Sequence, residues 1–105
     1  MFVVIVNFKI EDNDGNKNKF IESAPMYKET KGLIRKNYII NHDTNTAGGV
    51  YIFDTAENAH SWFDPERIAY LSERYSIPNI KYFQSPVEVN NENNSCLLYT
   101  SPSPR

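Results

Sequence analysis

A hairpin signal between residues 33 and 53 constrains the fold more than any other feature of the chain. Residues 33–40 and 50–53 are rich in β-branched, Leu and aromatic side chains, a composition typical of strands. Residues 41–46 between them are turn and loop formers, and Gly48-Gly49 gives the backbone freedom where the chain re-enters the sheet. The rest of the chain is therefore expected to flank this hairpin.

The segment before the hairpin predicts a strand and then a helix. Even positions from 2 to 10 are all apolar, and the odd positions begin apolar and turn polar, so both faces of this strand should be covered. A helix is predicted from about residue 17 to 31, restarting with Pro25 at its first position and ending at a left-handed Gly32. Its expected buried stripe consists of Phe20, Ile21, Ala24 and Tyr27.

The segment after the hairpin predicts a helix in two parts and a last strand. Asp54 with Glu57 three residues on resembles a capping box, and Asp64-Pro65 restarts the helix. A strand is expected over residues 80–89, with Pro86 at an edge or bulge. The inner side of the two-part helix is expected to carry Ala56, Ala59, Trp62, Phe63, Ile68, Leu71 and Tyr75.

The order strand, helix, strand, strand, helix, strand predicts an α+β fold of the ferredoxin-like βαββαβ type. It has four antiparallel strands and both helices on one face. Val3, Ile5, Leu33 and Ile39 then need a cover on the other face, and the same face of a second copy would supply it. We therefore expect a homodimer, a dimeric α+β barrel with an internal cavity.

Composition excludes several classes of protein. A net charge of −2, from 11 basic and 13 acidic residues, gives no basic stripe for nucleic acid. No apolar run approaches the ~20 residues of a membrane span, and no apolar leader precedes the first strand. The single cysteine forms no internal disulfide, and neither histidine has carboxylates at metal-ligand spacing. A cytoplasmic protein without a metal site, bound neither to nucleic acid nor to membrane, is expected.

The last residues are set apart from this fold. Residues 96–105 read CLLYTSPSPR, which matches the in-frame translation of a sequencing adapter. The alternative is a genuine tail with Ser-Pro repeats. In either case the domain is expected over residues 1–92, with a disordered tail over residues 93–105.

Three sequence blocks carry a resemblance to a known family. They read GLIRKNYI from residue 32, AGGVYIFDTAENAHSWF from residue 47 and IPNIKYFQSPVEVNN from residue 77. Over residues 1 to about 92 the chain resembles the YdhR-like "putative mono-oxygenase" family of the dimeric α+β barrel superfamily. The resemblance implies a fold related to the antibiotic-biosynthesis monooxygenases, which oxidise electron-rich aromatic substrates with dioxygen and without metal, flavin or haem. A cofactor-independent monooxygenase for a small aromatic or quinol-like compound is the function it implies.

Strand alternation predicts which side chains face the cavity. A one-residue slip would replace Arg35 and Asn37 by Lys36 and Tyr38. Tyr27, Trp62 and Phe63 are expected to line the cavity walls. The expected cavity-facing residues of the strands are Asn7, Lys9, Arg35, Asn37 and Tyr51.

A mechanism follows from these residues. Arg35, with Asn7 or Asn37, would stabilise a phenolate or enolate of the substrate, while Trp62 and Tyr51 stack on its ring. The structural alternatives are an ion pair at the strand edge for Arg35, hydrogen bonds to buried backbone across the dimer for Asn7, and core or interface packing for Tyr51 and Trp62. The alternative function is a non-catalytic or stress-related dimer that holds a small hydrophobic ligand. Polar groups converging on one apolar pocket would favour catalysis, whereas a pocket closed by Tyr and Phe would favour ligand holding.

Overall fold

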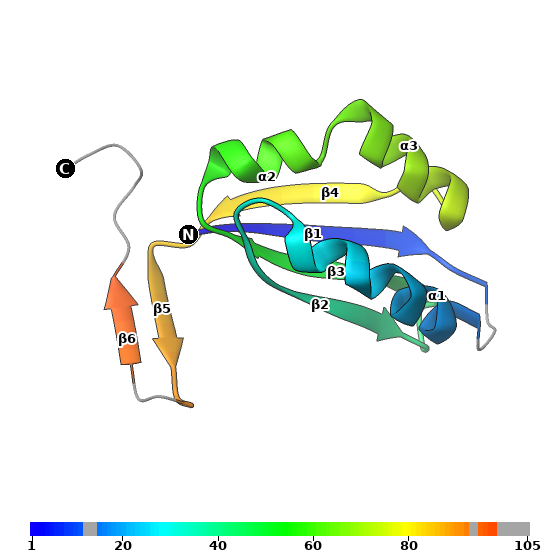
Figure 1. Cartoon of the computed structure of the whole chain (residues 1–105). Coiled ribbons are helices and arrows are strands. Elements are labelled where there is room, and N and C mark those ends of the chain that lie inside the picture. Colours follow the sequence, from blue (N-terminus) through cyan, green and yellow to red (C-terminus); the bar gives the residue numbers. More distant parts are fainter. Residues whose placement is uncertain (12–14, 93–94, 99–105) are drawn as a thin grey trace.

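The chain forms a four-stranded antiparallel sheet that carries its helices on one face (Figure 1). This computed structural model describes residues 1–11, 15–92 and 95–98. The predicted α+β, ferredoxin-like order of elements is confirmed. The elements are β1 (Phe2–Lys9), α1 (Gly15–Ser23), η1 (Ala24–Glu29), β2 (Leu33–Asn41), β3 (Thr46–Phe53), α2 (Ala56–Trp62), α3 (Pro65–Arg74), β4 (Asn79–Gln84), β5 (Val87–Asn90) and β6 (Ser95–Leu98).

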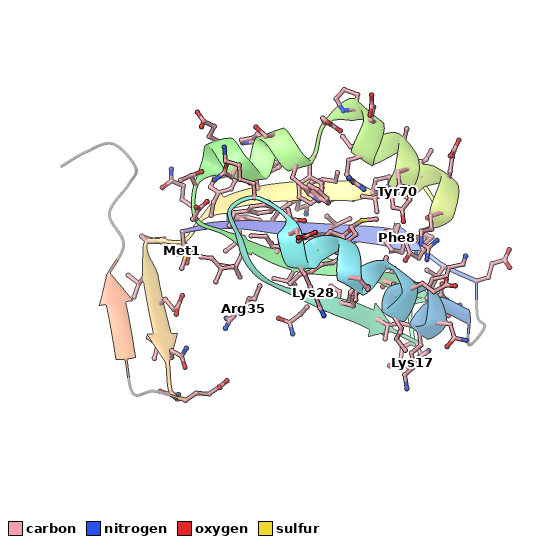
Figure 2. The ribbon with its side chains drawn as sticks, in the orientation of Figure 1. Met1, Phe8, Lys17, Lys28, Arg35 and Tyr70 are labelled. Carbon is pink, nitrogen blue, oxygen red and sulfur yellow. The ribbon has the colours of Figure 1, made fainter. Side chains whose placement is uncertain are left out.

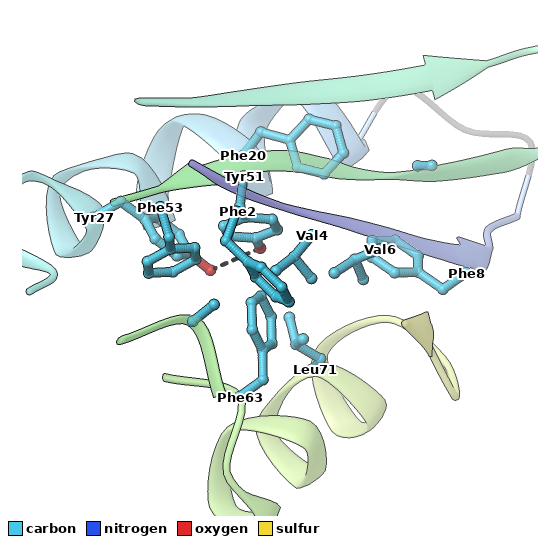
Figure 3. Packing of buried hydrophobic residues seen from close by; sticks show 12 residues of the cluster. Phe2, Val4, Val6, Phe8, Phe20, Tyr27, Tyr51, Phe53, Phe63 and Leu71 are labelled. Carbon is cyan, nitrogen blue, oxygen red and sulfur yellow. Dashed lines mark hydrogen bonds between the residues drawn. The ribbon is translucent and has the colours of Figure 1, made fainter. Parts of the chain in front are cut away.

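The sheet has the strand order β2-β3-β1-β4, so β1 and β3 are its central strands. Alternation on β1 buries the even positions Phe2, Val4, Val6 and Phe8 beneath the helices. Tyr51 lies opposite Val4 on β3 and is equally buried. Figure 3 shows Phe63 and Leu71 reaching from the helices toward these strand residues. The apolar core therefore lies between the sheet and the helix layer.

A β-bulge near the start of β2 decides which of its side chains face the helices. The register with β3 shifts between Leu33 and Arg35, so Leu33 pairs with Phe53 and Lys36 pairs with Tyr51. Because the extra residue reverses the alternation, Leu33 and Lys36 both face the helix side. The expectation that Leu33 shares the outer face with Ile39 is therefore wrong.

The first helical segment changes type at the expected place. α1 ends at Ser23, and Pro25 lies in the first turn of the 3₁₀ helix η1. Gly32 has the predicted left-handed backbone, with φ of +79°. Of the predicted stripe, Phe20 and Tyr27 are buried, but Ile21 and Ala24 are exposed. The tighter 3₁₀ turn after Ser23 rotates Ala24 outward, and Ile21 lies a third of a turn away from Phe20.

The second helical segment begins one residue later than predicted. Thr55, not Asp54, is the N-cap of α2, and its hydroxyl accepts a hydrogen bond from the Asn58 backbone N–H at 3.1 Å. Asp54 instead accepts one from the Asn58 side-chain amide at 2.8 Å. Asp64 caps α3 as predicted and accepts from the Arg67 N–H at 2.8 Å.

The C-terminal part of the described chain departs from the main sheet. After Pro86 the last predicted strand continues as β5, which pairs with β6 in a separate two-stranded sheet. In Figure 1 this sheet lies beyond the N-terminal end of β1. Ser95–Leu98 thus form a strand where the sequence predicts a disordered tail. The remainder of that tail, 93–94 and 99–105, lies outside the described residues.

The paired glycines of β3 give a test of the packing. A methyl group on Gly48 would overlap the Val6 carbonyl oxygen, whereas one on Gly49 would meet the flexible Lys36 side chain at 2.9 Å. We expect Gly48→Ala to lower the free energy of unfolding by about 1–3 kcal/mol, and Gly49→Ala to lower it less. Urea unfolding of both variants measures this. A Gly48→Ala protein as stable as the unchanged chain would contradict the register of β1 against β3.

Candidate functional site

An enclosed pocket lies between the sheet and the helix layer. Its free volume is about 10 Å³, room for one molecule of the size of water. Phe8 on β1 and Tyr70 on α3, both labelled in Figure 2, form part of its wall. Among the described residues no acidic side chain lines it, and rings dominate its surface. The lining consists of Phe8, Phe20, Ser23, Tyr27, Lys36, Tyr38, Gly48, Tyr51, Tyr70, Leu71, Arg74 and Tyr75.

The amine of Lys36 lies among three tyrosine rings. Its Nζ is 3.5 Å from the ring centre of Tyr27, 3.7 Å from that of Tyr38 and 4.6 Å from that of Tyr51. These rings come from η1, β2 and β3, so three separate elements build the cage. Gly49 contributes by leaving room, because a methyl group there would collide with the Lys36 chain. The cage therefore fixes the amine at the sheet surface.

Two effects act against each other on this amine. Burial, followed by the positive charge of Arg67, lowers the pKa of Lys36 to about 6. The faces of the three rings favour the ammonium form through cation–π attraction. With its pKa at about 6, Lys36 carries a neutral amine in most molecules at pH 7.

The tyrosine hydroxyls around Lys36 are paired and hold their protons. Those of Tyr27 and Tyr51 lie 3.5 Å apart, the contact drawn dashed in Figure 3. Those of Ser23 and Tyr38 lie 2.6 Å apart. Burial raises the pKa of Tyr38 to about 12 and also raises the pKa of Tyr27 and Tyr51. These hydroxyls are hydrogen-bonding groups at neutral pH, not bases.

An open hollow adjoins the enclosed pocket. It has a free volume of about 240 Å³ and lies between η1 and the edge strand β2. Tyr27, Lys36 and Tyr38 line both spaces. Lys36 therefore stands at the boundary between a surface hollow and an enclosed aromatic space. The hollow is lined by Ala24, Tyr27, Lys28, Leu33, Ile34, Arg35, Lys36 and Tyr38.

Arg67 and Trp62 form the neighbouring part of the helix layer. The Arg67 guanidinium lies 3.9 Å from the Trp62 ring centre, and the Trp62 ring lies 5.5 Å from that of Tyr27. Among the described residues, Arg67 Nε and Trp62 Nε1 are buried without a hydrogen-bond acceptor. Within the described residues the ion pair joins Arg74 to Glu22 at 3.2 Å. No carboxylate of these residues forms an ion pair with Arg67. This side of the site is therefore positively charged.

The structure divides the predicted site residues into two groups. Asn7, Lys9, Arg35 and Asn37 are exposed on the outer face of the sheet, and Figure 2 shows Arg35 extending away from the helices. Tyr27, Tyr51, Trp62 and Phe63 lie on the helix side.

The sheet separates these groups, so the predicted convergence of Arg35, Asn37 and Asn7 with Tyr51 is not found. Tyr51 pairs with Val4, whose side chain is in the core, whereas Asn7 belongs to the opposite set of β1 positions. Arg35 still reaches the rim of the hollow, because β2 is an edge strand.

Lys36 and Arg67 were not among the predicted site residues. Lys36 follows from the alternative register, in which it takes the place of Arg35, but the bulge that selects this register has no Gly or Pro to mark it. Arg67 gives no signal in the sequence, since an Arg in a helix most often faces solvent. Within the described ranges no group of three His, Cys, Asp or Glu side chains could hold a metal ion, and no helix is long and apolar enough to cross a membrane.

Comparisons with known proteins identify the family of this chain. Residues 3–93 match the family model described as "Putative mono-oxygenase ydhR", and the chain belongs to this family. A search of the curated proteins found no match.

Several solved structures share the fold at low identity. A "putative antibiotic biosynthesis monooxygenase" from Deinococcus radiodurans is 10% identical with a TM-score of 0.66, covering 86% of this chain and 97% of its own. SnoaB, a cofactor-independent oxygenase from Streptomyces nogalater, is 16% identical with a TM-score of 0.59, covering 80% and 92%. The monooxygenase ActVA-Orf6 of Streptomyces coelicolor, solved with the ligand nanaomycin D, is 18% identical with a TM-score of 0.61, covering 80% and 86%.

The lowered pKa of Lys36 predicts how stability changes with pH. Between about pH 6 and pH 10 the unfolded chain binds a proton at this lysine that the folded chain lacks, so the free energy of unfolding rises with pH. The contribution approaches ~1.4 kcal/mol per pH unit. Above about pH 10 the raised tyrosine pKa values act in the opposite direction.

Urea unfolding between pH 6.5 and 9.5 measures the free energy of unfolding of the unchanged chain and of Lys36→Met. The contribution of Lys36 is the difference between the slopes of the two curves against pH. Lys28→Met, which removes an exposed lysine, should keep the slope of the unchanged chain. Parallel curves for the unchanged chain and Lys36→Met would contradict the lowered pKa.

Proposed function

We propose that the protein is a cytoplasmic, cofactor-independent monooxygenase that acts on a small electron-rich aromatic or quinol-like compound. The observation that carries this proposal is the meeting of an open hollow and an enclosed aromatic pocket at Tyr27, Lys36 and Tyr38. Its position between the sheet and the helices, in a chain of a mono-oxygenase family, supports the assignment. This site on the helix side of the sheet replaces the site expected on the outer face of the sheet.

The two spaces suit the two reactants. A cofactor-free oxygenation needs an electron-rich substrate anion, groups that stabilise it and exclusion of water. The hollow admits an aromatic ring against Tyr27 and Tyr38. The enclosed pocket, whose free volume of about 10 Å³ holds one water-sized molecule, would take dioxygen after a small movement of its ring lining. Lys28 and Arg35 supply positive charge at the hollow, and Arg74 supplies it at the enclosed pocket. The cofactor-independent activity of SnoaB, which shares the fold, is consistent with such a reaction.

A second function, the holding of a small hydrophobic ligand without turnover, is favoured by one observation. The enclosed pocket is closed mainly by Tyr and Phe rings and leaves little free volume. A ligand bound in the hollow would then meet an aromatic wall and no reacting centre. Oxygen consumption separates the two functions.

We further propose that a second copy of the chain covers the outer face of the sheet. Ile5 and Val50 lie opposite each other at its centre, with Val3 and Ile52 beside them, and no helix of the described residues covers this face (Figure 1). The polar side chains of Asn7, Lys9, Arg35 and Asn37 surround this apolar centre. An apolar core with a polar rim is the usual anatomy of a protein interface.

Oxygen consumption in metal-free buffer tests the proposed reaction against a panel of dihydroxynaphthalenes, anthrones and quinols. Ala24→Trp would fill the hollow, and we expect it to lower the rate by about tenfold or more, since misplacing a substrate by ~1 Å costs up to ~100-fold. Ala69→Trp, at an exposed position on α3, is the matched control and should leave the rate unchanged. Panel compounds that bind without any oxygen uptake would favour the ligand-holding function.

Light scattering after size exclusion tests the second copy. We expect the unchanged chain to be a dimer and Ile5→Glu to be a monomer, because a charge at the centre of an apolar interface is left unpaired. Ile21→Glu places the same change on the exposed side of α1 and should remain dimeric. A monomeric unchanged chain, or equal effects of the two substitutions, would contradict this interface.

A further inference from the structure

We propose that Lys36 is the general base that removes the hydroxyl proton of the aromatic substrate, and that Arg67 tunes this base through its charge. The proposal rests on the hollow being the substrate site and names the residue that generates the electron-rich anion. The family match and the solved structures assign no role to either residue.

The position of Lys36 carries the proposal. Tyr27, Lys36 and Tyr38 line both the hollow and the enclosed pocket, and Lys36 has the sole amine among these three. A hydroxyl on a ring seated in the hollow would lie beside this amine, and the product anion would face the enclosed pocket. A neutral amine can accept a proton, whereas the neighbouring tyrosine hydroxyls hold theirs because burial raises their pKa.

The proton transfer balances without any further reactant. The Lys36 nitrogen forms a bond to the hydroxyl proton, the O–H bond breaks, and its electron pair stays on the substrate oxygen. The products are an ammonium and a phenolate, and no oxidation occurs in this step. The ammonium remains against the faces of Tyr27, Tyr38 and Tyr51, where cation–π attraction stabilises it beside the new anion.

The surroundings of Lys36 keep this base near its working range. Arg67 lowers the pKa of Lys36 in addition to the larger effect of burial, and no carboxylate in the part of the chain that the structure describes lines either space to oppose it. A base with a pKa close to the operating pH is the most effective. The charged and titratable groups that face or flank Lys36 are Tyr27 and Lys28 on η1, Arg35 and Tyr38 on β2, Tyr51 on β3, Arg67, Tyr70 and Arg74 on α3, and Tyr75 after α3.

The pH dependence of kcat/KM for oxygen consumption is the first test. Lys36→Met and Lys36→Arg should each lower kcat by about 10²–10⁴-fold, and Arg restores the positive charge but not the base. Arg67→Met should move the acidic limb of the profile to higher pH, because the pKa of Lys36 rises when a neighbouring positive charge is removed. Lys17→Met, at an exposed position on α1, should change neither rate nor profile.

Binding of 4-nitrophenol, an electron-poor phenol, under anaerobic conditions tests proton transfer without turnover. Trp62 is the only tryptophan of the chain and lies beside Tyr27, so its fluorescence reports occupancy. At about pH 6 the free probe is mostly neutral and colourless, and its phenolate is yellow. We expect yellow colour on binding to the unchanged chain and none with Lys36→Met.

The outcomes separate this proposal from the proposed function. A probe that fails to bind, binds without colour, or turns equally yellow with Lys36→Met overturns the role of Lys36 as base. Full oxygen consumption by Lys36→Arg also overturns it and leaves the monooxygenase function standing. Yellow colour that depends on Lys36, together with no oxygen uptake by any panel compound, overturns the monooxygenase function and leaves the base assignment standing.

Discussion

The site depends on the contact of one amine with three tyrosine rings, in a pocket that no carboxylate of the described residues lines. The Lys36 Nζ lies 3.5 Å and 3.7 Å from the centres of Tyr27 and Tyr38, each from a different element. Burial and the Arg67 charge disfavour the ammonium, and the ring faces favour it. A lysine in this balance can exchange a proton at neutral pH, which an exposed lysine does rarely.

Several local features of the fold place Lys36 among these rings. β2 is an edge strand, so a residue on it can border both the core and the surface, and the bulge after Leu33 turns Lys36 instead of Arg35 toward the helices. The restart at Pro25 brings Tyr27 over the amine from η1, and the glycine at position 49 leaves room for the lysine chain. The site is therefore a consequence of local backbone features in three segments of the sequence.

The sequence predicts the fold well because its patterns are local and regular. Even positions of β1 are apolar throughout, and Asp64-Pro65 and Gly32 mark ends of elements that the structure confirms. The sequence predicts the site less well. Which side chains of β2 face the helices depends on the bulge between Leu33 and Arg35, and no Gly or Pro within the bulge marks it. Tyr27, Tyr51, Trp62 and Phe63 lie together on the helix side, but the polar candidates Asn7, Lys9, Arg35 and Asn37 lie across the sheet from them.

The pKa of Lys36 itself is the measurement that tests this account most directly. NMR titration of the Lys36 side-chain Cε signal, assigned by its loss in Lys36→Met, reports protonation of this amine alone. The account predicts a midpoint at about pH 6. A midpoint near the ordinary value of 10.5 would show an ammonium at neutral pH and contradict the role of Lys36 as base.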